Sequence, residues 1–318
     1  MKHLYVIGNG FDIHHKIPSR YIKFKEWLEK NDKSTYSKLN EYLGVWPGDD
    51  IWWNDFETNL GDVSCVKEYA ENVALENLPN YASDDYRDRN LYDAEVEVEN
   101  DLGGLIDDLK YDFQQWASQL PYGEEGTGIK IEREDSVFLT FNYSLTLEKL
   151  YGIPSKQILH IHGVCNDWKS IVVGHGRSYQ DVRDEFDGMN PGASSIDPED
   201  MIEEDFSTTR AKDAAAFAIC GIRKDVKGII DRHKDFFESL KDVEYVHIYG
   251  FSFAETDLPY MDAIFEVVNR NRVHIEVSWF SDRDKERIES YFGKKGLRKK
   301  LCLVTLRDLA ACYCPSLF

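Results

Sequence analysis

The chain has 318 residues, of which 42 % are hydrophobic and 13 % aromatic, and this composition excludes a disordered protein. Its 38 Lys and Arg residues against 58 Asp and Glu residues give a formal net charge of −20, which argues against a nucleic-acid or membrane partner. A small anion is not excluded, because a glycine turn can bind phosphate in a locally favourable field.

The chain opens with an apolar run at residues 4–7 that runs straight into Gly8, Asn9 and Gly10, with Asp12 two residues later. The run predicts a buried strand, and the glycines permit a tight turn and close backbone approach. An exposed turn would explain the two glycines but not the apolar residues before them. A buried strand that ends at a phosphate or nucleotide explains both. The dinucleotide fingerprint has three glycines and this turn has two, so the motif is weak by itself.

The residues after this turn predict helices. The stretch "SRYIKFKEWLEK" has apolar residues at helical spacing, with Ser19 as a candidate cap, and "IWWNDFETNL" predicts a second helix. Residues 62–120 hold acidic helical stretches and no convincing strand. We therefore predict a helical insertion or subdomain over residues 62–130, within a Rossmann-like domain made of residues 1–61 and 131–318.

Short apolar runs and helices alternate through the second half of the chain. The polar, acidic segment 177–207 predicts a long loop or a lid over a site. Strands that alternate with helices of this length predict a mainly parallel sheet covered on both faces, an α/β fold of the Rossmann-like class. The strands are predicted at 136–142, 158–163, 170–176, 243–250, 273–280 and 301–306, and the helices at 145–152, 211–240, 257–270 and 282–294.

Polar residues and glycines follow five of the predicted strands, at the edge where such sheets bind ligands. This convergence is the main sequence evidence for a site, because no single motif matches it. The set is Asn9 and Asp12, Asn142 and Tyr143, His162 and Gly163, His175 and Gly176, and Gly250 and Ser252.

Each of these residues also has a structural interpretation. An Asn at a strand end most often completes a turn, and the functional interpretation of Asn142 is a carboxamide that holds a ribose hydroxyl or a water. Alternation in "ILHIHG" places His160 and His162 on one strand face. His162, followed by Gly163, suits a general base, whereas His160 is expected to be structural. Asp257 is most simply a helix N-cap or an acid in the first turn of a helix.

The metal-binding residue types are scattered. Six cysteines lie at positions 65, 165, 220, 302, 312 and 314 without paired ligand spacing, and the adjacent His14 and His15 lack a partner cluster. We expect no metal, and reduced thiols in a cytoplasmic protein. No signal segment is evident, and no stretch approaches the roughly 18 apolar residues that span a bilayer.

Six motifs, taken in order, resemble those of the AbiH abortive-infection proteins of bacterial anti-phage defence: "IGNGFDIHHKIPSRYIKFKEWL", "WNDFE", "TFNYSLTLEKLY", "HIHG", "VVGHG" and "YGFSFAETD". The resemblance covers nearly the whole chain and is weakest in 62–130 and 177–240. That family in turn looks like a divergent branch of the sirtuin-like NAD-binding fold. The resemblance therefore implies NAD, or a related nucleotide, as substrate or ligand.

The resemblance also implies roles for individual residues. In the sirtuin-like fold a glycine-rich turn holds the NAD pyrophosphate, an Asn contacts the ribose and a His-Gly pair carries the base. Matched onto this chain, the catalytic residues are His162 and Asn142, and the NAD-binding residues are Gly8, Asn9, Gly10, Phe11, Asp12, Tyr143, Gly163, Gly250, Ser252 and Asp257. Ser144 stands where that pattern has an acid, and the four-cysteine zinc site of sirtuin deacetylases is missing, which argues against protein deacylation.

The sequence and the resemblance together leave three candidate functions to be tested. The first is an NAD glycohydrolase that stops phage growth by exhausting the cofactor, with Asn142 orienting the ribose and His162 as base. The second is a non-catalytic module that binds NAD or ADP-ribose and gates a partner or assembly. The third is a nucleic-acid effector, which the net charge of −20 opposes. A second copy of the chain, a phage-derived trigger and a defence partner are the other expected partners.

Overall fold

The computed structural model describes residues 2–46, 48–78, 84–123, 128–187 and 205–311. They divide into two compact units, one from 1–23, 114–172 and 225–318, and the other from 24–113 and 173–224. The predicted domains 1–61, 62–130 and 131–318 divide the chain elsewhere. The difference arises because Phe24 packs edge-on against Trp53, Phe56 and Phe113, which ties the early helices to the predicted insertion.

The first unit contains a six-stranded sheet in the order β3-β2-β1-β4-β5-β6, and every neighbouring pair is parallel. This order is that of doubly wound nucleotide-binding sheets, in which the chain reverses direction between β1 and β4. The predicted α/β class and parallel sheet are confirmed. The strands are β1 (His3–Ile7), β2 (Ser136–Thr140), β3 (Ile158–His160), β4 (Tyr245–Tyr249), β5 (His274–Ser278) and β6 (Leu301–Val304).

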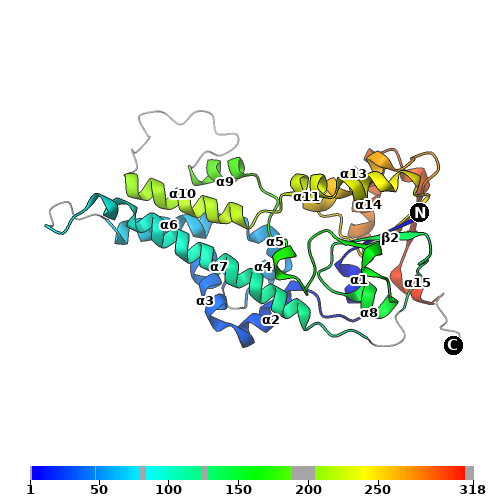
Figure 1. Ribbon diagram of the computed structural model, residues 1–318, viewed down its shortest axis with the longest axis horizontal. Coiled ribbons are helices and arrows are strands. Elements are labelled where there is room, and N and C mark those ends of the chain that lie inside the picture. Colours follow the sequence, from blue (N-terminus) through cyan, green and yellow to red (C-terminus); the bar gives the residue numbers. More distant parts are fainter. Residues whose placement is uncertain (1, 47, 79–83, 124–127, 188–204, 312–318) are drawn as a thin grey trace. The chain divides into compact units, whose positions relative to one another are not determined.

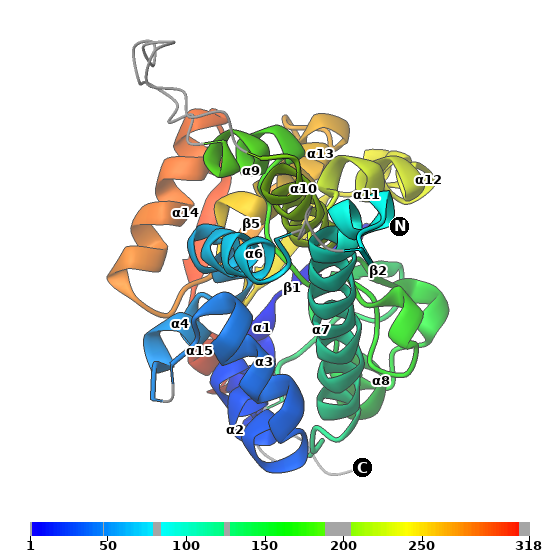
Figure 2. The same ribbon diagram turned by 90° about the vertical axis from the view of Figure 1, so that its left-hand side faces the viewer.

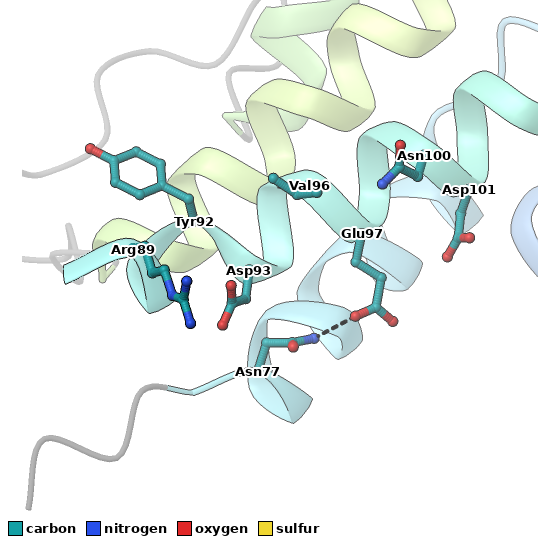
Figure 3. Close-up of a pocket in the computed structure, with 8 residues that line it drawn as sticks. All are labelled: Asn77, Arg89, Tyr92, Asp93, Val96, Glu97, Asn100 and Asp101. Carbon is teal, nitrogen blue, oxygen red and sulfur yellow. Dashed lines mark hydrogen bonds between the residues drawn. The ribbon is translucent and has the colours of Figure 1, made fainter. Parts of the chain in front are cut away.

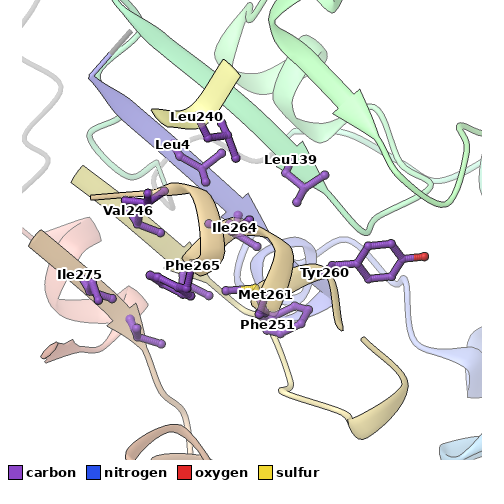
Figure 4. Close-up of a cluster of buried hydrophobic side chains, with 14 of the residues drawn as sticks. Leu4, Leu139, Leu240, Val246, Phe251, Tyr260, Met261, Ile264, Phe265 and Ile275 are labelled. Atoms are coloured by element: carbon purple, nitrogen blue, oxygen red, sulfur yellow. The ribbon is translucent and has the colours of Figure 1, made fainter. Parts of the chain in front are cut away.

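Alternate residues of the strands face two separate cores. Leu4 and Val6 of β1 belong to the larger core, drawn in Figure 4, and Tyr5 and Ile7 belong to the smaller one. Burying each such side chain stabilises the fold by roughly 1.5–3 kcal/mol. Figure 1 shows α11 and α13 on one side of β2, and α1 and α8 on the other. Helices α11 (Val226–Arg232), α12 (Lys234–Ser239), α13 (Leu258–Val267) and α14 (Asp282–Lys294) supply the larger core, and α1 (Asn9–His14), α8 (Thr146–Tyr151) and α15 (Leu306–Ala311) the smaller.

The second unit is helical. Helix α10 lies along α6, and Figure 2 shows the two helices close together. A salt bridge of 3.0 Å from Lys212 to Glu71 joins them. Between Phe24 and Lys224, the described part of this unit contains no strand. Its helices are α2 (Tyr21–Asn31), α3 (Lys33–Leu43), α4 (Asp50–Asn54), α5 (Phe56–Asn59), α6 (Ser64–Glu76), α7 (Asp93–Ser118), α9 (Tyr179–Phe186) and α10 (Phe206–Gly221).

A predicted strand and a predicted loop are wrong. The predicted strand over 170–176 is a 3-10 turn followed by irregular chain with one isolated bridge at His175. Its Gly174 has φ +144° and approaches the carbonyl of Ile222 so closely that a Cβ would lie 1.4 Å from that oxygen, so the backbone is not a regular strand there. The predicted loop 177–207 contains α9, which Ser178 caps, and it reaches the first turn of α10; residues 188–204 lie outside the described residues.

Candidate functional site

The glycine turn after β1 packs against the turn after β4. The N–H groups of Gly8 and Gly10 donate to the carbonyls of Tyr249 and Gly250, both at 2.9 Å. A Cβ on Gly8 would lie 2.6 Å from the Gly250 oxygen, and a Cβ on Gly10 would lie 2.8 Å from the Gly250 Cα. Gly250 itself has φ +66°. The three glycines therefore allow two backbones to touch at the point where the sheet reverses direction, which accounts for them without a ligand.

Asp12, on α1, is the centre of a buried polar cluster beside this contact. The side chain is 1 % exposed and accepts hydrogen bonds from the hydroxyls of Ser144 at 2.5 Å and Thr146 at 2.6 Å. Burial raises the pKa of Asp12, and the bonds from Ser144, Thr146 and Asn142 oppose that rise. Ser144, which stands where the resemblance expects an acid, thus lies against a carboxyl group from another element.

Asn142 has a fixed amide orientation. Its Nδ2 donates to the carbonyl of Gly8 at 3.2 Å and also bonds to Asp12, so both neighbours of the nitrogen are acceptors. The opposite atom, Oδ1, is buried and has no hydrogen-bond partner among the described residues, and the residue as a whole is 6 % exposed. A buried acceptor left in this state costs about 1–3 kcal/mol, which a donor from a ligand or a water would recover.

His162 lies in the turn after β3, not on the strand as alternation predicted. The ring is 2 % exposed and sits among Phe141, Tyr143 and Tyr260, with ring centroids 5.2, 6.4 and 5.6 Å away. Its Nε2 is 3.8 Å from Oδ1 of Asp257, which is an ion-pair distance but too long for a hydrogen bond. Asp257 occupies the N-cap position of α13, as its structural interpretation predicted, although its side chain makes no cap hydrogen bond there.

Sequence analysis missed the contacts of His160 and did not single out Glu148. His160 ends β3, where its Nδ1 bonds to the main-chain carbonyl of Asn142 at 3.2 Å and its Nε2 to Oε1 of Glu148 at 3.0 Å. A signal was available in "FNYSLTLE", because Asn142, Ser144, Thr146 and Glu148 are polar residues at every second position. Those four side chains make the buried polar contacts of the site.

A family sequence model described as "Bacteriophage abortive infection AbiH" matches residues 4–279. The chain belongs to the AbiH family. The family predicted from the motifs is confirmed, and membership supports a role in phage abortive infection. The match includes every candidate residue from Gly8 to Asp257, the whole helical unit, and the sheet unit as far as residue 279. A comparison with curated proteins gave no match.

The other predicted residues of this AbiH chain have local structural partners. Tyr143 donates its hydroxyl to the carbonyl of Val172 at 2.8 Å. Phe11 is fully buried in the smaller core, next to His15. Gly163 has φ +86°, and a Cβ there would lie 2.1 Å from the oxygen of Ser170. Both Gly163 and Phe11 therefore shape the site without facing it.

Two predicted polar residues are exposed, and a third lies outside the sheet unit. Asn9 exchanges hydrogen bonds with Ser19. Ser252 accepts a long hydrogen bond of 3.4 Å from the N–H of Ala254. His175 belongs to the helical unit, where its Nε2 bonds to the carbonyl of Ile219. His175 is therefore not part of the group of strand-end residues that the sequence predicted.

A cavity of about 590 Å³ lies elsewhere in this AbiH chain, between the end of α6 and the start of α7 in the helical unit (Figure 3). Asp93, Glu97 and Asp101 face it with one cation, Arg89, and Asn77 donates to Glu97 at 2.9 Å. This excess of acid suits an anionic nucleotide poorly. We therefore place the candidate site at the strand ends, where the buried polar groups converge.

Two further properties concern only the described ranges of the chain. No helix within them is long and apolar enough to cross a membrane. No group of three or more His, Cys, Asp or Glu side chains within them could hold a metal ion.

Proposed function

We propose that the carboxyl ends of β1, β2 and β4 bind NAD, and that the protein hydrolyses the bond between nicotinamide and ribose. The observation that carries this proposal is Oδ1 of Asn142, a buried acceptor without a partner among the residues described. Gly8 and Asp12 hold the amide nitrogen, so the oxygen faces away from both. A ribose hydroxyl is a donor of the kind that this oxygen lacks.

His162 supplies the second requirement of the reaction. Cleavage of an N-glycosidic bond builds positive charge on the ribose, so the enzyme must hold the sugar and direct a water to it. In this proposal His162 accepts the proton of that water or of a ribose hydroxyl, and Asp257, 3.8 Å away, stabilises the imidazolium. NAD and water give ADP-ribose, nicotinamide and one proton.

The proposed chemistry agrees with the family's role and with the charge of the chain. Depletion of NAD would halt the metabolism that a phage needs, and abortive infection is an outcome of that kind. The substrate is a small molecule, so the enzyme needs no basic surface for nucleic acid, and the net charge of −20 provides none.

A non-catalytic module that binds NAD or ADP-ribose is the second candidate. It is favoured by the distance of 3.8 Å from His162 to Asp257, which is longer than that of a hydrogen-bonded catalytic pair. The glycine turn does not separate the two candidates, because the N–H groups of Gly8 and Gly10 donate to carbonyls in either case. In this form the protein would bind the nucleotide and gate a partner or an assembly.

Chromatography of NAD incubated with the purified protein distinguishes the two candidates. We expect the wild type to release nicotinamide and His162→Ala to be slower by about 10²–10⁴-fold, the usual contribution of a general base. His274→Ala, at the exposed start of β5, is the matched control and should act like the wild type.

Turnover that survives in His162→Ala would refute the role of this residue. Binding of ADP-ribose without any turnover would favour the second candidate. The absence of both, also after addition of an extract of phage-infected cells, would refute both candidates.

A further inference from the structure

Next to Asn142, the side chains of His160 and Glu148 join β3 to α8. The side chains of His160 and Glu148 are 12 % and 17 % exposed, so solvent screens their interaction little. Nε2 of His160 is 3.0 Å from one carboxylate oxygen, Oε1. The other oxygen, Oε2, is buried and has no hydrogen-bond partner within the described chain. Glu148 is therefore directed at His160.

The partners of His160 determine its hydrogen-bonding role. A main-chain carbonyl and a carboxylate can only accept, yet each lies against one ring nitrogen. A ring that makes both bonds must donate from both nitrogens, which is the state of an imidazolium. Glu148 supplies the opposite charge, and the carboxyl of Asp12 lies close enough for His160 to lower its pKa.

We infer that Glu148 and His160 position Asn142 for its ligand, a role that rests on the proposed function where that ligand is NAD. His160 holds the main-chain carbonyl of Asn142, while Gly8 and Asp12 hold the amide nitrogen of the same residue. Asn142 is thus fixed at both ends, and Oδ1 is the polar atom left over. Glu148 and His160 touch neither the ligand nor the reacting atoms; they are positioning residues.

Nuclear magnetic resonance of the ligand-free protein tests the pair without any activity. In protein labelled with ¹⁵N-histidine, the two hydrogen bonds predict a proton on each ring nitrogen of His160, with the signals assigned by their loss in His160→Gln. Glu148→Gln keeps the shape of the side chain and removes the charge, and one of those nitrogens should then lose its proton. Lys149→Gln, exposed on the next position of α8, should change nothing. An unprotonated ring nitrogen in the wild type would contradict the proposed hydrogen bonds of His160 to Glu148 and to the carbonyl of Asn142.

Binding of ADP-ribose, measured by calorimetry, tests the positioning role. Glu148→Gln should weaken binding by about tenfold at a temperature where the variant is fully folded by circular dichroism, the effect of one charge-assisted hydrogen bond. Lys149→Gln should bind like the wild type. Equal binding by Glu148→Gln and the wild type would overturn the positioning role.

If the wild type binds neither NAD nor ADP-ribose, the proposed function is refuted, but the positioning role of Glu148 and His160 can still be tested on the side chain of Asn142. In ¹⁵N-asparagine-labelled protein, the side-chain amide signal of Asn142 should shift in Glu148→Gln and not in Lys149→Gln. An unshifted signal in both variants would overturn the inference.

Discussion

At the scale of single residues, Gly250 shows how a motif that suggests a ligand can serve packing. Its φ of +66° and its approach to Phe11, where a Cβ would lie 2.1 Å from the backbone nitrogen, leave no room for a side chain. The sequence predicted a glycine turn at this position but not that the two turns face each other. That contact joins residues more than 200 positions apart, so no local pattern could reveal it.

We predict that Gly250→Ala lowers the free energy of unfolding by about 2–4 kcal/mol, since both the left-handed backbone and the contact with Phe11 oppose a Cβ. Gly293→Ala is the matched control. Gly293 lies in α14, where a Cβ would meet nothing within 4 Å, so this change should stabilise by about 0.5–1 kcal/mol. Urea unfolding measures both, and equal stability of the two variants would contradict the packing role.

At the scale of elements, His15 ties α1 to α8. Its Nδ1 donates to the carbonyl of Phe11 at 2.7 Å, and its Nε2 accepts from the hydroxyl of Tyr151 at 2.6 Å. The N–H of Ile129 donates to the same hydroxyl, which leaves the Tyr151 proton for His15. The imidazole must therefore be neutral for the bond to Tyr151 to form.

Burial lowers the pKa of His15 from 6.5 to about 4. The unfolded chain then binds more protons than the folded chain between pH 6.5 and 4. The contribution of neutral His15 to the free energy of unfolding is therefore complete above pH 6.5 and is lost as the pH falls. We predict that the free energy of unfolding of the wild type falls by up to about 3 kcal/mol over this pH range, and that His15→Gln does not show this fall. Urea unfolding at several pH values compares the two proteins, and parallel curves would contradict this coupling.

The elements also show what could be predicted from sequence. Apolar runs identified the six strands, and charged amphipathic spacing identified α14 at 282–294, as observed. Helix α9 was predicted to be loop because "YQDVRDEF" is so polar, although Ser178 and Asp181 form a capping box that announces a helix start. Glu148 was missed for another reason: its partner His160 comes from a different element, and pairing across elements leaves no mark in a local pattern.

At the scale of the whole molecule, the sheet unit carries the candidate residues, and the family match covers the helical unit and the sheet unit as far as residue 279. The strand order places the ends of β1 and β2 side by side, and this brings Gly8, Asp12 and Asn142 together from segments 130 residues apart. The sequence predicted this meeting through the general rule for parallel sheets. The rule does not predict the amide orientation of Asn142, its burial or the lack of a partner for its Oδ1 among the described residues, because these depend on side-chain packing.

The most direct test of the account is a calorimetric titration of NAD into the wild type, Asn142→Ala and the control Asn271→Ala, whose exposed side chain lies at the other end of the sheet, before β5. The account predicts that the wild type and the control bind NAD, and that Asn142→Ala, with its fold retained, binds at least about tenfold more weakly. Equal binding by all three proteins would place NAD elsewhere, and no binding by the wild type would contradict the proposed ligand.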